Sequence, residues 1–398
     1  MLTPTELVSI ADSVVEIYSQ VEQDIVSDIA RRIVNAGYIT ETAKWQIEKA
    51  QEFGYFQGDI EKILANATGK TRKEIAKLMK ESGITALKRD DEIYRAAGLN
   101  PQSIAKSPAL QAVMLQGVDD IMALVGNYTK TTAKMATMAY NSLLDRAYLQ
   151  IISGAYDPNT AIKMAVKDLA TQGIHKIAYP SGTEQSVESS VRRAVTTGIN
   201  QSVSKLQLAR MDEMGCELVE VSSHAGARPE HAVWQGQIYS RKGKHKEYPD
   251  FVSSTGYGTG AGLCGWNCYH TFFPYFEGIS TKSFSPDPAK DAGKDNDEMY
   301  KQQQKQRVYE RRIRESKKEC VAYNSAIGSC KDDKLRADLE KDFARASVKL
   351  KDREARLKNF LEETKRTRYS EREQVLGFDR SVSSKAVWAN RKAKKPKK

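Results

Sequence analysis

Apolar side chains recur at helical spacing through the first half of the chain. Between residues 5 and 36 they fall at three- and four-residue steps, from Leu7 to Ile33, which places one apolar stripe along a helix. Thr3 followed by Pro4 is typical of a helix start, because proline fits the first helical turn. We expect this stripe to pack into a core or against a partner helix.

Glycines divide the pattern that follows into shorter predicted helices. Gly54, Gly58, Gly69, Gly83 and Gly98 stand between apolar segments, where glycine commonly ends a helix. The predicted helices have the ranges 40–50, 59–68, 71–82, 90–97, 107–127, 129–153, 157–171 and 184–214.

The hydrophobic period changes after Gly215. Residues 216–222 alternate between apolar and polar positions and are rich in Val, which predicts a strand. Residues 237–240 predict a second short strand. Before this region, residues 173–179 alternate in the same way, and His175 within them is expected to be a surface or core side chain rather than a ligand.

The last quarter of the chain is charged. Residues 278–297 mix Gly, Ser, Pro, Asp and Lys and predict a linker. Residues 298–319 and 331–367 carry sparse apolar side chains at helical spacing, which predicts a helical hairpin or a coiled-coil-like face for a partner.

Together these elements predict a mainly α protein with a small α+β part. We expect a helical body at 1–180, an α+β module at 181–277, a linker at 278–297 and a basic helical tail with a disordered end at 298–398.

The net charge of +11 is unevenly distributed over the 398 residues. Residues 301–398 contain 30 Lys and Arg against 15 Asp and Glu, a net charge of +15, whereas the first 300 residues have a net charge of −4. Such asymmetry indicates contact with a polyanion, above all nucleic acid, although a solvated helical face has the same composition. The terminal basic residues expected to contact phosphates are Arg391, Lys392, Lys394, Lys395, Lys397 and Lys398.

Targeting signals are not recognisable in the sequence. No apolar run approaches the roughly 20 residues that span a bilayer, and the start, Met1 to Leu7, lacks the basic and then apolar pattern of a signal peptide. Five Cys cannot all pair. We therefore expect the chain to be made and kept in a cytoplasm, without a membrane signal.

The stretch that begins at His224 and ends at residue 274 concentrates uncommon side chains: four of the five His, two of the five Cys and two of the four Trp. Cys264, Cys268 and His270, with His224 or His231, offer enough sulfur and imidazole ligands for a tetrahedral zinc site. The Cys-x3-Cys-x-His spacing differs from the Cys-x2-Cys of common zinc knuckles. Packed thiols and hydrogen-bonded imidazoles explain the same residues without a metal.

A metal-dependent nuclease or hydrolase is the alternative function for this stretch. It would use His224 or His231 together with Asn267 and His270, but no acidic cluster or strand–helix frame accompanies them. The nucleophile turn of a Ser or Cys hydrolase is not recognisable either.

Two other features of the stretch have structural interpretations. Arg228, His231, Trp234 and Gln235 would lie close together if a helical turn follows Pro229, and could fix a loop or form a patch for a partner protein. The glycine-rich loop at 253–262 lacks the Lys-Ser or Lys-Thr and the strand–loop–helix frame of a phosphate cradle, so we favour a flexible or close-packed loop.

The motif residues resemble a known family. Residues 222–231, the Trp-Gln-Gly at 234–236 and residues 264–270 are similar to the phage minor capsid protein 2 family, which resembles a branch of the phage Mu F-like head-morphogenesis proteins. The similarity covers roughly residues 185–275, including the helix at 192–200. The motif residues are His224, Arg228, His231, Trp234, Gln235, Gly236, Trp266 and Asn267.

The chain departs from this family in one detail. Many relatives end the motif with Asn-Cys-Arg-Cys, whereas this chain has Asn267, Cys268, Tyr269 and His270. The exchange of Cys for His is compatible both with a metal ligand and with a buried polar contact.

The resemblance implies a virion component that is made beside the portal protein, assembled in the host cytoplasm and carried inside the head in few copies. It implies a role in head assembly, and in DNA packaging or genome delivery. The partners would be the portal protein or inner capsid proteins, and packaged DNA through the basic tail. An enzymatic activity is not implied, because residues 301–398 contain no catalytic constellation.

Overall fold

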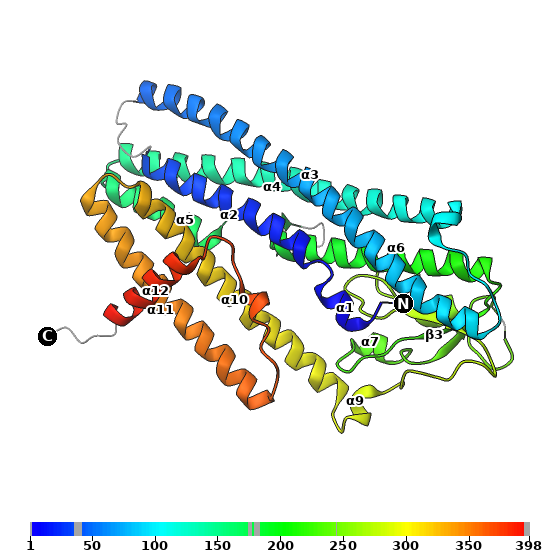
Figure 1. Cartoon of the computed structure of the whole chain (residues 1–398). Helices are drawn as coiled ribbons and strands as arrows, with labels where there is room; N and C mark the ends of the chain where they lie inside the picture. Colours follow the sequence, from blue (N-terminus) through cyan, green and yellow to red (C-terminus); the bar gives the residue numbers. More distant parts are fainter. Residues whose placement is uncertain (1, 36–41, 174–176, 179–183, 244, 394–398) are drawn as a thin grey trace. The chain divides into compact units, whose positions relative to one another are not determined.

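The computed structural model describes every residue except 1, 36–41, 174–176, 179–183, 244 and 394–398. The predictions for His175 and for Lys394, Lys395, Lys397 and Lys398 therefore lie outside the described residues. The described chain is mainly α, as the sequence predicts (Figure 1).

The first half of the chain forms long helices. Their bounds are α1 Pro4–Ser9, α2 Asp12–Asn35, α3 Thr42–Ala96, η1 Ile104–Lys106, α4 Pro108–Ile152, α5 Pro158–Gln172 and α6 Val187–Glu213. The single helix predicted for residues 5–36 is instead two helices, which separate at Ile10. Thr3 and Glu6 form a reciprocal capping box at the start of α1, which satisfies two backbone donors there.

The glycine stops predicted before residue 90 are wrong. Helix α3 runs for 55 residues through Gly54, Gly58, Gly69 and Gly83. None of these four has a positive φ, whereas Gly98, just beyond the helix, has a φ of 77°. Glycine ends a helix when it takes the left-handed conformation, so only the last of the five predicted stops acts as one. The helices predicted at 107–127 and 129–153 are likewise continuous as α4.

Helix α4 also changes one expectation from the sequence. It contains a window long and apolar enough to cross a membrane, and α4 alone has this property among the described helices. The core helix of a protein without membrane contact passes the same test, so this property does not assign a membrane. The expectation that no apolar stretch approaches that length is nevertheless wrong for α4.

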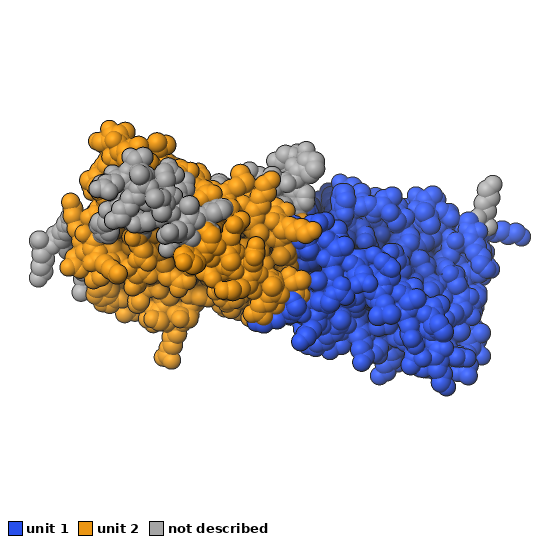
Figure 2. Space-filling view, turned by 90° about the horizontal axis from the view of Figure 1, so that it is seen from above, with its two compact units in different colours: residues 1–15, 69–127, 189–304 blue, residues 16–68, 128–188, 305–398 orange. Residues whose placement is uncertain are grey.

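The chain divides into two compact units, each built from three separate stretches (Figure 2). Unit 1 contains residues 1–15, 69–127 and 189–304, and unit 2 contains residues 16–68, 128–188 and 305–398. The sequence pattern instead divides the chain into four consecutive parts, which follow the order of the residues rather than their contacts. That division stays a prediction.

Unit 2 is a helical bundle that includes most of the basic C-terminal region. The bounds of its last elements are α10 Asn296–Ser329, which begins in unit 1, α11 Asp333–Thr364, η2 Ser370–Glu373 and α12 Arg380–Ala393. Figure 1 shows α10 and α11 as an antiparallel pair. Of the two predicted alternatives, a helical hairpin or a coiled-coil-like face for a partner, this is the hairpin. The apolar side chains of the two helices share one core with α2, α3, α4, α5 and α12, and the buried apolar set from α11 is Leu335, Leu339, Phe343, Ala346, Leu350, Leu357, Phe360 and Leu361.

A buried charge network lies in unit 2. Lys318 Nζ is 2.8 Å from Glu22 Oε2 and 3.0 Å from Glu188 Oε1. Arg314 Nε lies 3.2 Å from Glu188 Oε2, and the Ser19 hydroxyl donates to Glu188 Oε1 at 2.6 Å. Basic side chains of α10 are thus bound by acidic side chains from earlier parts of the chain.

Unit 1 contains a three-stranded antiparallel sheet with the order β4-β3-β5. The strands are β3 Leu218–Val221, β4 Ile238–Ser240 and β5 Phe272–Tyr275, and Val219 pairs with Tyr239 on one side and Pro274 on the other. The predictions for 216–222 and 237–240 are confirmed, whereas β5 has no counterpart among the predicted strands. A separate two-stranded pair, β1 Ile177–Ala178 and β2 Glu184–Gln185, belongs to unit 2.

Short helices complete unit 1, with bounds α7 Pro229–Ala232, α8 Phe251–Thr255 and α9 Pro288–Asp291. The stretch predicted as a linker, 278–297, contains α9 and packs against the sheet. The backbone N–H groups of Ser283 and Phe284 donate to the Glu220 carboxylate at 2.8 and 2.7 Å.

Candidate functional site

The sheet register brings the motif residues together. Val221, the last residue of β3, pairs with Phe272, the first residue of β5, so the segment that follows β3 and the segment that precedes β5 lie at the same end of the sheet. His224 lies in the first segment and His270 in the second. Their rings stack with centroids 4.4 Å apart.

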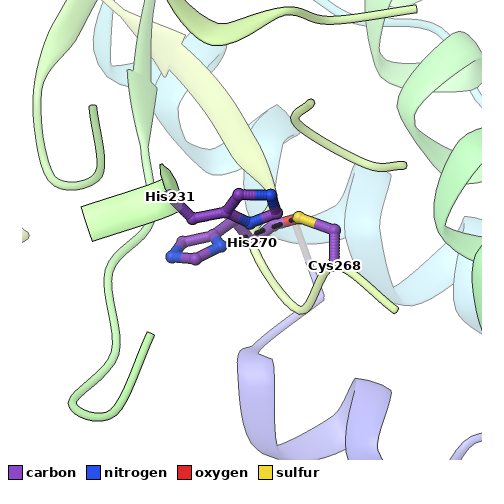
Figure 3. A group of neighbouring side chains, drawn as sticks. All are labelled: His231, Cys268 and His270. Carbon is purple, nitrogen blue, oxygen red and sulfur yellow. Dashed lines mark hydrogen bonds between the residues drawn. The ribbon is translucent and has the colours of Figure 1, made fainter. Parts of the chain in front are cut away.

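Three side chains form the centre of this site: His231 from α7, and Cys268 and His270 from the loop before β5 (Figure 3). Their potential ligand atoms all lie within 4.8 Å of one another. The exposed fraction is 2% for His231 and 1% for each of the other two. The centre is therefore closed to solvent.

Hydrogen bonds fix both imidazoles. The Nε2–H of His231 donates to the carbonyl oxygen of Ala261 at 2.8 Å, and the Nε2–H of His270 donates to Gln235 Oε1 at 3.0 Å. Gln235 Oε1 also accepts the backbone N–H of His224 at 3.1 Å, which fixes the orientation of the amide. A neutral imidazole that donates from Nε2 carries its lone pair on Nδ1, and His270 Nδ1 lies 3.6 Å from Cys268 Sγ.

The other two predicted metal ligands lie at the edge of this centre. His224 is only partly buried and stacks on His270. Cys264 is buried, and its thiol donates to the carbonyl oxygen of His270 at 3.7 Å. The structure thus groups His231, Cys268 and His270 and leaves His224 and Cys264 outside the group of three.

Aromatic and polar motif residues surround the three side chains. Trp234 is buried, with its ring centroid 4.7 Å from that of His231 and 4.8 Å from that of His270. Arg228 Nη2 donates to the carbonyl oxygen of Trp266 at 3.0 Å. These contacts, with the hydrogen bond from His270 to Gln235, join the loop at 264–270 to the segment that contains α7.

Gly236, Trp266 and Asn267 have backbone or surface roles. Gly236 has a φ of 61°, and a Cβ there would lie 2.2 Å from the carbonyl oxygen of Ser285, so only glycine fits. Trp266 is 64% exposed. Asn267 is exposed and has a φ of 53°, and its backbone N–H donates to Thr197 Oγ1.

The glycine-rich loop is close-packed. A Cβ on Gly262 would lie 2.0 Å from the carbonyl oxygen of Gly256, and a Cβ on Gly265 would lie 2.5 Å from that of Gly260. Backbone approaches backbone at these positions, which explains the glycines. This agrees with the close-packed loop that the sequence favours over a phosphate cradle.

Two asparagines that the sequence does not single out support the site. Asn200 of α6 is buried, and its Nδ2 donates to the carbonyl oxygens of Cys268 and His270 at 3.2 and 3.1 Å. Asn296 Oδ1 accepts the backbone N–H groups of Gly226 and Ala227 at 2.9 and 3.1 Å. These contacts link positions 68 to 70 residues apart, and no local motif signals them.

The protonation states do not favour nucleophilic catalysis. Burial raises the pKa of the Cys268 thiol to about 11. Burial also lowers the pKa of His270 well below its usual value, with further lowering by His224 and His231. Thiol and imidazole are therefore both neutral at pH 7 without a bound cation, unlike an activated thiolate–imidazolium pair. The neighbouring Ser222 hydroxyl accepts the backbone N–H of Thr271 at 2.9 Å and is buried.

Of the predicted nucleic-acid contacts, the structure describes Arg391 and Lys392, which belong to unit 2. Arg391 is exposed near the end of α12, and Lys392 belongs to the same helix. The two residues are therefore helical, whereas the sequence predicts a disordered end. Their contact with DNA stays a prediction.

Comparison with known proteins gives two matches. The family model described as phage minor capsid protein 2 matches residues 2–362. A protein of Lactococcus phage LL-H named "Structural protein" is 27% identical over 188 residues, which cover 46% of this chain and 49% of that protein. The match thus spans about half the length of this curated relative. No solved structure matches the chain.

Proposed function

The chain belongs to the phage minor capsid protein 2 family, and on this basis we propose that it is a minor structural protein of the phage head, located inside the particle beside the portal. The family match carries this proposal, because it covers nearly the whole described chain rather than the motif alone. The resemblance noted in residues 222–236 and 264–270 is thereby confirmed.

A structural role agrees with the burial of the motif. His231, Cys268 and His270 are each at most 2% exposed, so a substrate cannot reach them without unfolding the loop. The metal-dependent nuclease or hydrolase would also need Asn267 beside the histidines, but Asn267 lies on the exposed side of the loop. We therefore do not propose an enzymatic activity.

The helices are the proposed contact surface for the portal or the inner capsid wall. On α4, Met138, Leu149 and Ile152 are 51%, 59% and 49% exposed. Their separations of 11 and 14 residues place them on one helical face. An exposed apolar stripe of this kind favours protein contact.

The C-terminal region is the proposed contact surface for packaged DNA, during packaging or genome delivery. Its net charge of +15 suits an interior filled with phosphate. Buried ion pairs occupy Arg314 and Lys318, so the exposed basic side chains of α11 and α12 and the terminal lysines would make this contact.

Protease protection of purified phage particles tests the location. We expect the chain to be detected by mass spectrometry in DNase-treated particles, to resist added protease while the heads are intact, and to be cleaved once the heads are opened. A pull-down with the co-expressed portal protein tests the partner. Absence from the particles would overturn the proposed function, and cleavage in intact heads would overturn the interior location.

A further inference from the structure

The centre formed by His231, Cys268 and His270 has the ligand chemistry of a structural zinc site. Two imidazoles and one thiol are typical zinc ligands, and a mixed nitrogen and sulfur donor set favours zinc over the oxygen-preferring cations. We propose that these three side chains bind one zinc ion that stabilises unit 1. The inference does not depend on the proposed location in the phage head.

The spacing of the ligand atoms fits this ion. Zinc–sulfur and zinc–nitrogen bonds of about 2.3 and 2.05 Å give a tetrahedral edge of about 3.6 Å between the two ligand atoms. Cys268 Sγ and His270 Nδ1 are 3.6 Å apart. All the ligand atoms of the group lie within 4.8 Å of one another, so no pair exceeds a tetrahedral edge by more than about 1.2 Å, a difference that small side-chain rotations would close.

The surroundings orient the two imidazoles as metal ligands. A histidine that binds a metal usually donates its other ring N–H to a protein oxygen, which fixes the tautomer and the ring plane. His231 donates to Ala261 O and His270 donates to Gln235 Oε1. Both tautomers therefore carry the lone pair on Nδ1, and the amide of Gln235 is fixed by a second donor, the N–H of His224.

The location of the ligands explains why a cation would matter. His231 lies on α7, and Cys268 lies 37 residues later, immediately before β5. Among the described residues between them, the regular elements are a three-residue strand and a five-residue helix, and the glycine-rich loop follows. An ion held at both ends of this stretch constrains a long loop on a small sheet, and such binding contributes directly to folding stability.

The burial of the centre assigns the ion a structural role. Structural zinc sites usually have four protein ligands, whereas catalytic sites keep one position for water or substrate; here a buried water molecule would complete the three protein ligands, in a centre that substrate does not reach. All three side chains are nearly inaccessible, and Trp234 covers both histidine rings.

Metal analysis of the full-length chain, purified without chelator, tests the proposal. We expect about one zinc per chain in the natural sequence and a loss to background in Cys268→Ser and in His231→Ala. Cys216→Ser is the matched control, because Cys216 is another buried thiol of unit 1 and donates only to backbone oxygens. This control should keep its zinc.

A second measurement guards against variants that fail to fold. Cobalt added to the metal-free natural chain should give the visible absorption of a cobalt–thiolate bond, which Cys216→Ser should retain and Cys268→Ser should lose. Chelator should lower the Tm of the natural chain by about 5 °C or more. The proposal would be overturned if the natural chain contains no zinc, gives no cobalt–thiolate absorption and has the same Tm with and without chelator. It would also be overturned if Cys216→Ser alone loses its zinc.

Discussion

Lys318 Nζ lies 3.0 Å from Glu188 Oε1, with side chains that are 21% and 7% exposed. The pair joins the basic C-terminal region to a residue 130 positions earlier, at the start of α6. Part of the positive charge that appears in the sequence as a basic tail is therefore internal to unit 2. Deleting residues 305–398 would remove part of the unit 2 core, so point substitutions separate folding from DNA contact better than truncation does.

Replacing Lys318 should strongly destabilise unit 2. Lys318→Met leaves the buried carboxylates of Glu22 and Glu188 without their shared partner, and breaking a buried pair costs about 3–5 kcal/mol. Lys358→Met is the control, because Lys358 and its partner Glu362 are 70% and 65% exposed and such a surface pair contributes at most about 1 kcal/mol. Urea unfolding measures both, and equal losses would contradict the internal role of Lys318.

Acid should weaken unit 2 through Glu188. Burial raises the pKa of Glu188, but Lys318, Arg314 and Ser19 outweigh burial and lower the pKa from 4.5 to about 2. A carboxyl with a lowered folded-state pKa stabilises the fold above its unfolded pKa and loses this contribution as the pH falls toward the folded value. Stability from this group should therefore decline between about pH 4.5 and 2.

The natural chain and Glu188→Gln, compared by thermal unfolding across this pH range, check the assignment. Glu188→Gln should be less stable than the natural chain at pH 7, and the difference should shrink toward pH 2. A constant difference across the range would show that the charge of Glu188 is not the cause.

The same substitution should have opposite effects at two glycines. Gly236→Ala places a Cβ 2.2 Å from Ser285 O at a φ of 61°, and such overpacking costs about 1–3 kcal/mol. At Gly69 in α3 a Cβ meets nothing within 4 Å, and alanine in a helix is favoured over glycine by about 1 kcal/mol. Chemical denaturation should show a loss for the first variant and a gain for the second. A loss at Gly69 would contradict a continuous α3.

DNA binding should depend on the terminal basic residues. Each phosphate contact contributes roughly −0.9 to the slope of log K against log salt concentration. Changing all six predicted contacts, from Arg391 to Lys398, to Gln should therefore make the slope shallower by up to about 5. The control changes six exposed lysines of α3 to Gln: Lys62, Lys70, Lys73, Lys77, Lys80 and Lys88. Fluorescence anisotropy with a labelled DNA duplex measures the slope. An equal change of slope in both variants would show that the terminal residues are not a specific DNA contact.

The helices were largely predictable because their apolar stripes persist in the sequence. The helix boundaries were less predictable, because the sequence does not show whether a glycine such as Gly83 takes a positive φ and ends the helix. Strand β5 was missed for a related reason: Pro274 lacks the N–H of a central strand, and its presence argues against a strand. The order β4-β3-β5 puts β5 at an edge, where proline is tolerated.

The candidate site was predictable as a set of residues but not as a geometry. His231, Cys268 and His270 are conspicuous because such side chains are rare in this chain. Their grouping depends on the pairing of Val221 with Phe272 and on Asn200, which contacts the loop across about 70 residues. Contacts between residues that far apart in the chain produce no periodic pattern in the sequence, so they cannot be predicted from it.

The interleaved composition of the two units has a consequence for synthesis. The chain passes between units five times, and Glu22 meets Lys318 across 296 residues. Translation at roughly 5–20 residues per second takes about 15 to 60 s to cover that distance. During this interval the apolar face of α2 has no access to its final partners on α10. We expect the nascent chain to need protection from aggregation until its last third leaves the ribosome.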